Sequence, residues 1–200
     1  MAPDYGPMSR NRPRLLSFDR SFVAYWSRQY VEDDKSVGGK EQELFTRVGP
    51  QVAKRGYYQK AEMAMVGDWK SPRIRSRLAR NPDEDVRDIS RLALAAPERL
   101  QHRILSLLHG VRDPVASALL TVWAPDRHTV IDFRAVEALG KLQSIGALGQ
   151  EVPPHSTGEL PDYTQYLECC RSVARHCGVG LRDLDRALWK WSKEGMPETH

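Results

Sequence analysis

Apolar residues recur along this chain at the three- and four-residue spacing of helices that bury one face. The first two stripes lie before residue 53 and consist of Phe22, Val23, Trp26 and Tyr30, then Leu44, Phe45, Val48 and Val52. Gly38-Gly39 separates the stripes, and Pro50 interrupts the second because proline cannot donate a helical hydrogen bond. We therefore expect two or three helices in this part of the chain.

Turn and capping signals divide the remaining chain into short helices. Ser71-Pro72 and Asn81-Pro82 each place a capping residue before a proline, which fits the first turn of a helix. Periodic segments predict further helices over residues 57–69, 83–96, 97–108, 114–123, 132–142, 162–178 and 181–193. The segment 114–123 is apolar nearly all round, so we expect it to form the buried axis of the fold. The β-branched run 129–131 has no partner strand and is predicted to be a loop that leads into a helix.

These elements predict an all-α fold, a compact orthogonal bundle of about nine or ten short helices, built as one unit or as two packed lobes. Residues 1–14 contain three prolines without periodicity and are predicted to form a mobile N-terminal arm, followed by a single helical domain over residues 15–200. The sequence has neither an apolar run of the roughly 20 residues that span a bilayer nor a signal-like start. We expect a cytoplasmic monomer without a membrane partner, associated with the nucleoid if the source is bacterial.

Positive charge is concentrated in one segment, within a chain whose formal net charge is +4. Between residues 69 and 80 the basic residues occur without any acid: Lys70, Arg73, Arg75, Arg77 and Arg80. Such a segment is either a solvated helix face or a surface that contacts nucleic-acid phosphates.

The cysteines are odd in number and lie in one predicted helix, as Cys169, Cys170 and Cys177. This is a poor disulfide framework, so we expect buried thiols in a reducing compartment. The spacing of potential ligands predicts no metal site, and we expect no cofactor.

Residues 107–114 read Leu-Leu-His-Gly-Val-Arg-Asp-Pro and predict a hairpin between two helices. Leu107 and Leu108 are expected to face inward, Asp113 can cap the second helix, and Pro114 fits its first turn. Backbone N–H groups at such a turn and helix start are free to bind phosphate. The candidate DNA contacts are the turn residues His109, Gly110, Val111, Arg112 and Asp113, together with the basic residues Lys70, Arg73, Arg75 and Arg77.

This hairpin resembles that of the helix-hairpin-helix DNA glycosylase superfamily, in which Leu-Pro-Gly-Val-Gly precedes an Ala-rich helix. About twenty residues later the superfamily has its catalytic aspartate at the start of a helix, where this chain has Asp132 within Thr-Val-Ile-Asp-Phe-Arg-Ala-Val. The resemblance covers about forty residues and implies a base-excision enzyme that hydrolyses the N-glycosidic bond of a damaged or modified base. Asp132 would stabilise the cationic sugar or orient the attacking water.

The chain departs from the superfamily pattern at two positions of the hairpin. Arg112 replaces the second glycine, and Pro114 stands where bifunctional members carry their Schiff-base lysine. Since proline has no amine, the resemblance implies a monofunctional glycosylase. Such an enzyme also needs a wedge and an aromatic base pocket, for which Trp69, Tyr57 and Tyr58 are candidates, although aromatic residues at helix ends also pack in cores.

Two other functions remain open from the sequence. A protein of the same fold could bind DNA without catalysis, as the substitutions at Arg112 and Pro114 suggest. A helical regulatory or antitoxin-like protein could resemble the superfamily only locally. The role of Asp132 decides between the enzyme and the non-catalytic binding protein. An aspartate before an apolar helix can act in catalysis, but it can also serve only as the cap of that helix.

Overall fold

The computed structural model describes residues 17–33, 35–148, 152–153 and 159–197, and within them it contains helices and turns but no strand. In chain order the elements are α1 (Arg20–Asp33), α2 (Lys35–Glu43), η1 (Leu44–Val48), α3 (Gly49–Arg55), α4 (Lys60–Lys70), η2 (Pro72–Ile74), α5 (Arg75–Leu78), α6 (Asp83–Ala95), α7 (Glu98–Leu105), α8 (Asp113–Trp123), α9 (Phe133–Ser144), α10 (Tyr163–Cys177) and α11 (Leu181–Lys193). Because α2, η1 and α3 follow one another without a break, as do η2 and α5, the described chain forms ten continuous helical stretches. The predicted all-α fold is confirmed. The predicted N-terminal arm, residues 1–14, lies outside the described residues.

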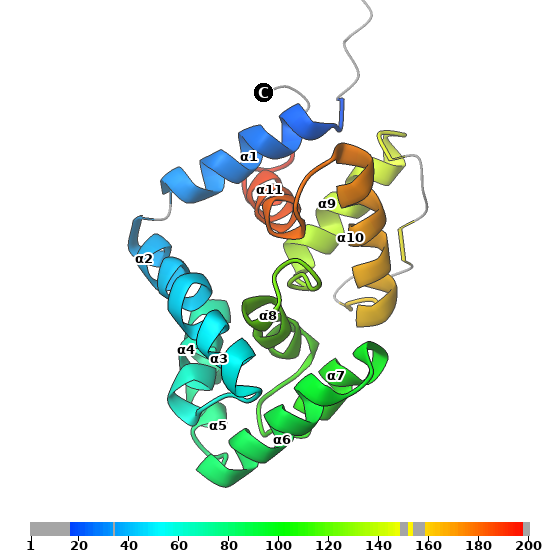
Figure 1. Ribbon diagram of the computed structural model, residues 1–200. Coiled ribbons are helices and arrows are strands. Elements are labelled where there is room, and N and C mark those ends of the chain that lie inside the picture. Colours follow the sequence, from blue (N-terminus) through cyan, green and yellow to red (C-terminus); the bar gives the residue numbers. More distant parts are fainter. Residues whose placement is uncertain (1–16, 34, 149–151, 154–158, 198–200) are drawn as a thin grey trace, which may run out of the picture.

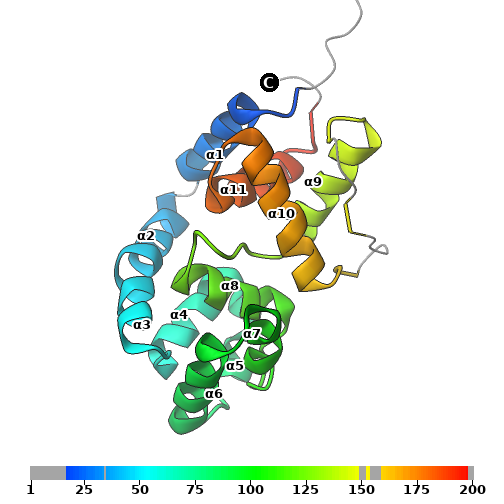
Figure 2. The ribbon, with the colours of Figure 1, turned by 45° about the vertical axis from the view of Figure 1, so that its right-hand side comes forward.

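The helices form two groups that meet at the centre of the molecule. One group contains α1, α9, α10 and α11, the other contains α3 to α8, and α2 connects them along one side (Figures 1 and 2). In the first group α1 and α9 both pack against α11, and in the second α4 and α7 both pack against α8. A residue that faces the junction can therefore contact elements from both groups.

Helix α8 is the buried axis of its group, as its apolar sequence predicts. Every residue from Val115 to Val122 is buried. Its two buried polar side chains bond the helix backbone, with Ser117 Oγ donating to the Pro114 carbonyl at 3.0 Å and Thr121 Oγ1 to the Ser117 carbonyl at 2.7 Å. Each of these buried hydroxyl groups thus has a hydrogen-bond acceptor inside the helix itself.

The segment from His128 to Ile131 runs between the two helix groups in an extended, non-helical conformation and is completely buried. Neighbouring side chains bond its backbone: the Tyr166 hydroxyl donates to the Val130 carbonyl at 3.2 Å, and the Ile131 N–H donates to Ser117 Oγ at 3.0 Å. A buried loop requires such partners, because unpaired backbone groups are costly away from water. The predicted loop is therefore held firmly, and it fixes the position of Asp132, which follows it.

Burial of His128 predicts that the protein loses stability in mild acid. Its ring is fully buried, Nδ1 lies 3.3 Å from the Tyr163 hydroxyl, and burial lowers the pKa of His128 to about 4, although Glu98 acts in the opposite direction. Because the unfolded chain takes up this proton near pH 6.5 and the folded one only near pH 4, stability falls as the pH drops through that window. One pKa unit corresponds to about 1.4 kcal/mol, so we expect a loss of about 3 kcal/mol.

Urea unfolding at pH 7.5 and pH 4.5 measures this loss. His128→Gln should flatten the pH dependence, whereas His176→Gln, which removes an exposed histidine at the end of α10, should leave it unchanged. Equal pH dependence in wild type and His128→Gln would show that His128 does not cause it.

All three cysteines are buried, which confirms their predicted place in the core. Burial raises the pKa of the Cys170 thiol well above its ordinary value. None of the described helices combines the length and the apolarity needed to cross a membrane.

Candidate functional site

A cavity of about 250 Å³ opens where the two helix groups meet. It is lined by residues from four parts of the chain: Tyr30 of α1, Trp69 and Lys70 at the end of α4, Val130 and Asp132 of the inter-helix segment, and Arg182, Asp185, Arg186 and Trp189 of α11. We call this cavity the Asp132 pocket. It combines aromatic surface with several charged groups, as small-molecule sites in proteins commonly do.

Asp132 caps α9 and faces the pocket at the same time. Its Oδ1 accepts a hydrogen bond from the Arg134 N–H at 3.0 Å, and its Oδ2 accepts one from Lys70 Nζ. The Lys70 side chain is 12% exposed and that of Asp132 is 23% exposed. Lys70 ends α4 and Asp132 begins α9, so each charge also interacts favourably with the dipole of its own helix. Asp132 therefore caps α9 and lines the pocket at the same time.

Behind the pocket lies a mostly buried ion-pair network that joins α2 to α11. Glu41 accepts hydrogen bonds from Arg182 Nη2 at 2.7 Å and from Arg186 Nε at 2.9 Å, and Arg182 also pairs with Asp185. Burial alone would raise the pKa of Glu41, but the two guanidinium groups outweigh it and hold that pKa below its ordinary value. Burial raises the pKa of Asp185, although Arg182 opposes the change. The network fixes the pocket wall that α11 provides.

Aromatic rings form the other walls of the pocket. The Tyr30 and Trp189 rings meet edge to face at 5.5 Å between centroids, and Trp69 meets Phe45 in the same way at 5.9 Å. The Arg182 guanidinium lies over the Tyr30 ring at 5.5 Å and over the Trp69 ring at 5.2 Å. These contacts hold the rings in place, so the aromatic surface is preformed.

The turn between α7 and α8, residues 106–112, is tied to the basic segment by Asn81. The Asn81 side chain accepts from the His109 N–H at 2.7 Å and donates to the carbonyls of His109 at 2.9 Å and Leu78 at 3.0 Å. Gly110 has a φ of +81°, and a Cβ there would lie 2.7 Å from the Cβ of Arg77. The turn therefore needs glycine both for its backbone conformation and for its close approach to α5.

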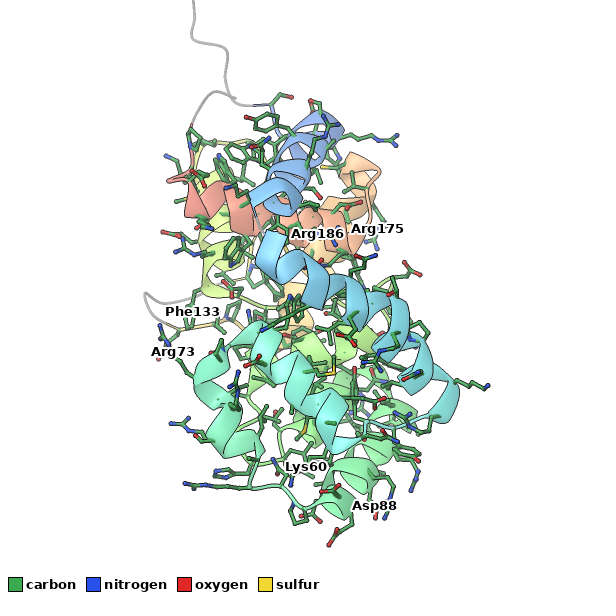
Figure 3. All side chains as sticks on the ribbon, turned by 90° about the vertical axis from the view of Figure 1, so that its left-hand side faces the viewer. Lys60, Arg73, Asp88, Phe133, Arg175 and Arg186 are labelled. Carbon is green, nitrogen blue, oxygen red and sulfur yellow. The ribbon has the colours of Figure 1, made fainter. Side chains whose placement is uncertain are left out.

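The predicted DNA contacts fall into three structural groups. His109, Arg112, Arg73 and Arg77 are exposed, and Figure 3 shows Arg73 pointing outward. Arg75 is exposed but pairs with Asp68. Lys70 points instead to Asp132, and Val111 is only 1% exposed, so its side chain cannot contact DNA. We call the exposed residues Arg73, Arg77, His109 and Arg112 the basic surface. Its residue Arg73 lies in η2, which follows the pocket residues Trp69 and Lys70 along the chain.

Two sequence expectations about the turn are wrong. Arg112, rather than Asp113, is the N-cap of α8, because its backbone is extended while Asp113 already belongs to the helix, and no side chain caps this end. Leu107 does not face inward but is 69% exposed, because α7 ends at Leu105 and the chain turns before Leu107 can continue the buried stripe. Leu108 is buried as expected.

Asn81→Ala should lower the free energy of unfolding by about 1–3 kcal/mol, because it leaves the His109 N–H without its partner in a site where Asn81 is 5% exposed. Chemical denaturation measures the loss. Gln165→Ala removes an exposed amide on α10 and should change stability by no more than about 0.5 kcal/mol. If the two variants are equally stable, Asn81 does not support the turn.

No family model, curated protein or solved structure matches this chain. Within the described residues there is no group of three or more His, Cys, Asp or Glu side chains placed to hold a metal ion.

Of the three aromatic candidates, only Trp69 lines the pocket. Tyr58 is 1% exposed, and its hydroxyl donates to the Leu119 carbonyl at 2.6 Å, so it is a core residue. The guanidinium carbons of Arg55 and Arg91 lie over the Tyr57 ring, at 4.8 and 4.7 Å from its centroid. Tyr57 is not part of the pocket lining. The prediction that Tyr57 and Tyr58 contribute to the pocket is wrong.

Sequence reasoning missed Tyr30 of α1 and the charged pocket residues of α11. Arg182 and Arg186 are four residues apart, as are Asp185 and Trp189, so each pair shares one side of α11. This spacing was visible in the sequence, but charged residues four apart usually lie on a solvated helix face. The acid that draws the arginines inward, Glu41, is far away in the chain.

Proposed function

We propose that this protein is a monofunctional DNA glycosylase of the helix-hairpin-helix type, which hydrolyses the N-glycosidic bond of a damaged or modified base. The observation that carries the proposal is the position of Asp132. Its carboxylate lines a preformed aromatic pocket and is oriented by Lys70 and by the Arg134 N–H. The basic surface at η2, α5 and the α7–α8 turn is connected to the same pocket through the end of α4.

In the proposed reaction, the bond between the sugar C1′ and the base nitrogen breaks, and its electron pair leaves with the base. Asp132 stabilises the positive charge that develops on the sugar and accepts a proton from the water that attacks C1′. The departing base takes up a proton from solvent, so one water is consumed for each base released. A carboxylate held by two hydrogen bonds is oriented before the reaction begins, which is what such stabilisation requires.

The pocket suits one planar base. Its volume of about 250 Å³ lies just below the roughly 300 Å³ at which small-molecule sites begin, so it would hold a base but not a base pair. Tyr30, Trp69 and Trp189 offer ring surface against which a base can stack. A target base would leave the duplex and enter the pocket while the basic surface holds the phosphates on either side.

Purified protein incubated with duplexes that contain uracil, alkylated purines, oxidised guanine or mismatches tests the proposal. Alkali then cleaves the strand wherever a base has been removed, and we expect product from at least one of these duplexes. Salt-sensitive DNA binding without any product would favour the non-catalytic module. No salt-sensitive binding at all would favour the regulatory protein.

Borohydride trapping tests the monofunctional part of the proposal. Pro114 provides no amine, and the Lys70 ammonium is held by the carboxylate of Asp132, so we expect no covalent complex with DNA. A trapped complex that disappears in Lys70→Ala would instead assign a lysine lyase step to Lys70.

A further inference from the structure

Phe133 is an exposed aromatic residue at the start of α9, directly after Asp132. Its side chain is 54% exposed, and it does not belong to the hydrophobic core of the described residues or to the side chains packed against that core. A large aromatic side chain left in water forgoes the favourable burial that it could otherwise gain. The ring of Phe133 is therefore available for contact with another molecule.

Both chain neighbours of Phe133 lie close to the Asp132 pocket. Asp132 lines the pocket, and the Arg134 guanidinium lies 5.8 Å from the ring centroid of Trp189, which also lines it. In the view of Figure 3, Phe133 and Arg73 both lie toward the same edge of the molecule, and Arg73 belongs to the basic surface. An exposed apolar ring thus directly follows the pocket carboxylate along the chain.

The aromatic residues suggested by the sequence are less accessible than Phe133 for the role of a wedge beside an extruded base. Tyr58 is buried in the core, and the Tyr57 ring is covered by two guanidinium groups. Trp69 packs edge to face against Phe45 and belongs to the inner wall of the pocket. Phe133 differs from all three because its ring is free to enter another molecule.

We propose that Phe133 enters the base stack of bound duplex DNA and fills the space left by the base that turns into the Asp132 pocket. Apolar side chains, phenylalanine among them, are known to enter between stacked bases and to separate them. This inference rests on the proposed glycosylase function, because it assumes that duplex DNA binds across the pocket mouth. It adds a positioning residue that acts on the DNA stack rather than on the reacting bond.

Binding to a duplex with a tetrahydrofuran abasic analogue tests this role without knowledge of the target base. The wild-type protein should bind this duplex more tightly than an intact one, because the gap accepts the Phe133 ring. Phe133→Ala should reduce that preference by about fivefold or more, the scale expected for the loss of one ring stacked on a base. Its affinity for the intact duplex should stay within about twofold, since phosphate contacts dominate that binding. Fluorescence anisotropy measures both affinities.

Two variants serve as controls. Phe133→Trp keeps an aromatic ring and should restore the preference, while Leu92→Ala removes an equally exposed apolar side chain from α6 and should have no effect. If wild-type protein shows no preference for the abasic duplex, or if Phe133→Ala keeps it, the wedge role is wrong. The glycosylase proposal is tested separately, by the release of a base from the lesion-containing duplexes.

Discussion

Glu41→Ala is expected to destabilise the protein by about 3–5 kcal/mol, the usual cost of removing one partner from a buried ion pair. Glu41 is 5% exposed and accepts hydrogen bonds from both Arg182 and Arg186, whose side chains are 14% and 24% exposed. Without the carboxylate, the ion pairs that remain for these arginines include a 3.8 Å approach of Arg186 to the exposed Asp183 and the pair between Arg182 and Asp185. The variant thus leaves positive charge in a site that water reaches poorly.

Chemical denaturation at neutral pH measures this loss, and Glu43→Ala provides a matched control two residues away. Glu43 pairs with Arg47 at 2.5 Å, but both side chains are 46% exposed, so its removal should cost no more than about 1 kcal/mol. If Glu41→Ala is no more destabilising than Glu43→Ala, the network does not hold α2 against α11.

Asp132→Asn is expected to separate chemistry from folding. Asparagine is as good an N-cap as aspartate, and its side-chain oxygen can still accept from Arg134 N–H or from Lys70, so we expect a stability loss of only about 1 kcal/mol. DNA affinity should remain within a few-fold, because the basic surface is unchanged. The rate of base release should fall by about 10²–10⁴, because the amide carries no negative charge to stabilise the sugar cation and is a poor base.

Asp162→Asn is the control for the capping role of Asp132. Asp162 caps α10 by accepting from the N–H groups of Thr164 at 2.9 Å and Gln165 at 3.2 Å, and it does not line the Asp132 pocket. Both variants therefore alter a helix cap, but only one alters the pocket. If the two lose stability and activity in parallel, Asp132 is a cap and nothing more.

The fold was accessible from the sequence because its helices bury regular apolar stripes. The all-round apolar pattern of residues 114–123 identified the central helix, and the unpaired run 129–131 identified the loop before Asp132. Periodicity reports which face of an element is buried, and these elements depend on little else. The cap at Asp132 was likewise a local feature.

Most of the pocket could not be predicted, because it depends on contacts between distant residues. Lys70 belongs to a run of basic residues, yet the end of α4 turns it toward Asp132 and away from the basic surface. Asn81 carries the local signal of a helix start, but its side chain binds His109 instead. In both cases the partner lies more than twenty residues away, where local patterns carry no information.

The rate of base release in a single turnover tests the central claim most directly. It should be measured for wild type, Asp132→Asn and Asp162→Asn on the duplex from the lesion panel that gives the most product. We predict release by wild type and Asp162→Asn at rates within a few-fold of each other, and a rate for Asp132→Asn lower by about 10²–10⁴. No release by the wild type from any duplex, or an undiminished rate in Asp132→Asn, would contradict the assignment of Asp132 as the catalytic carboxylate.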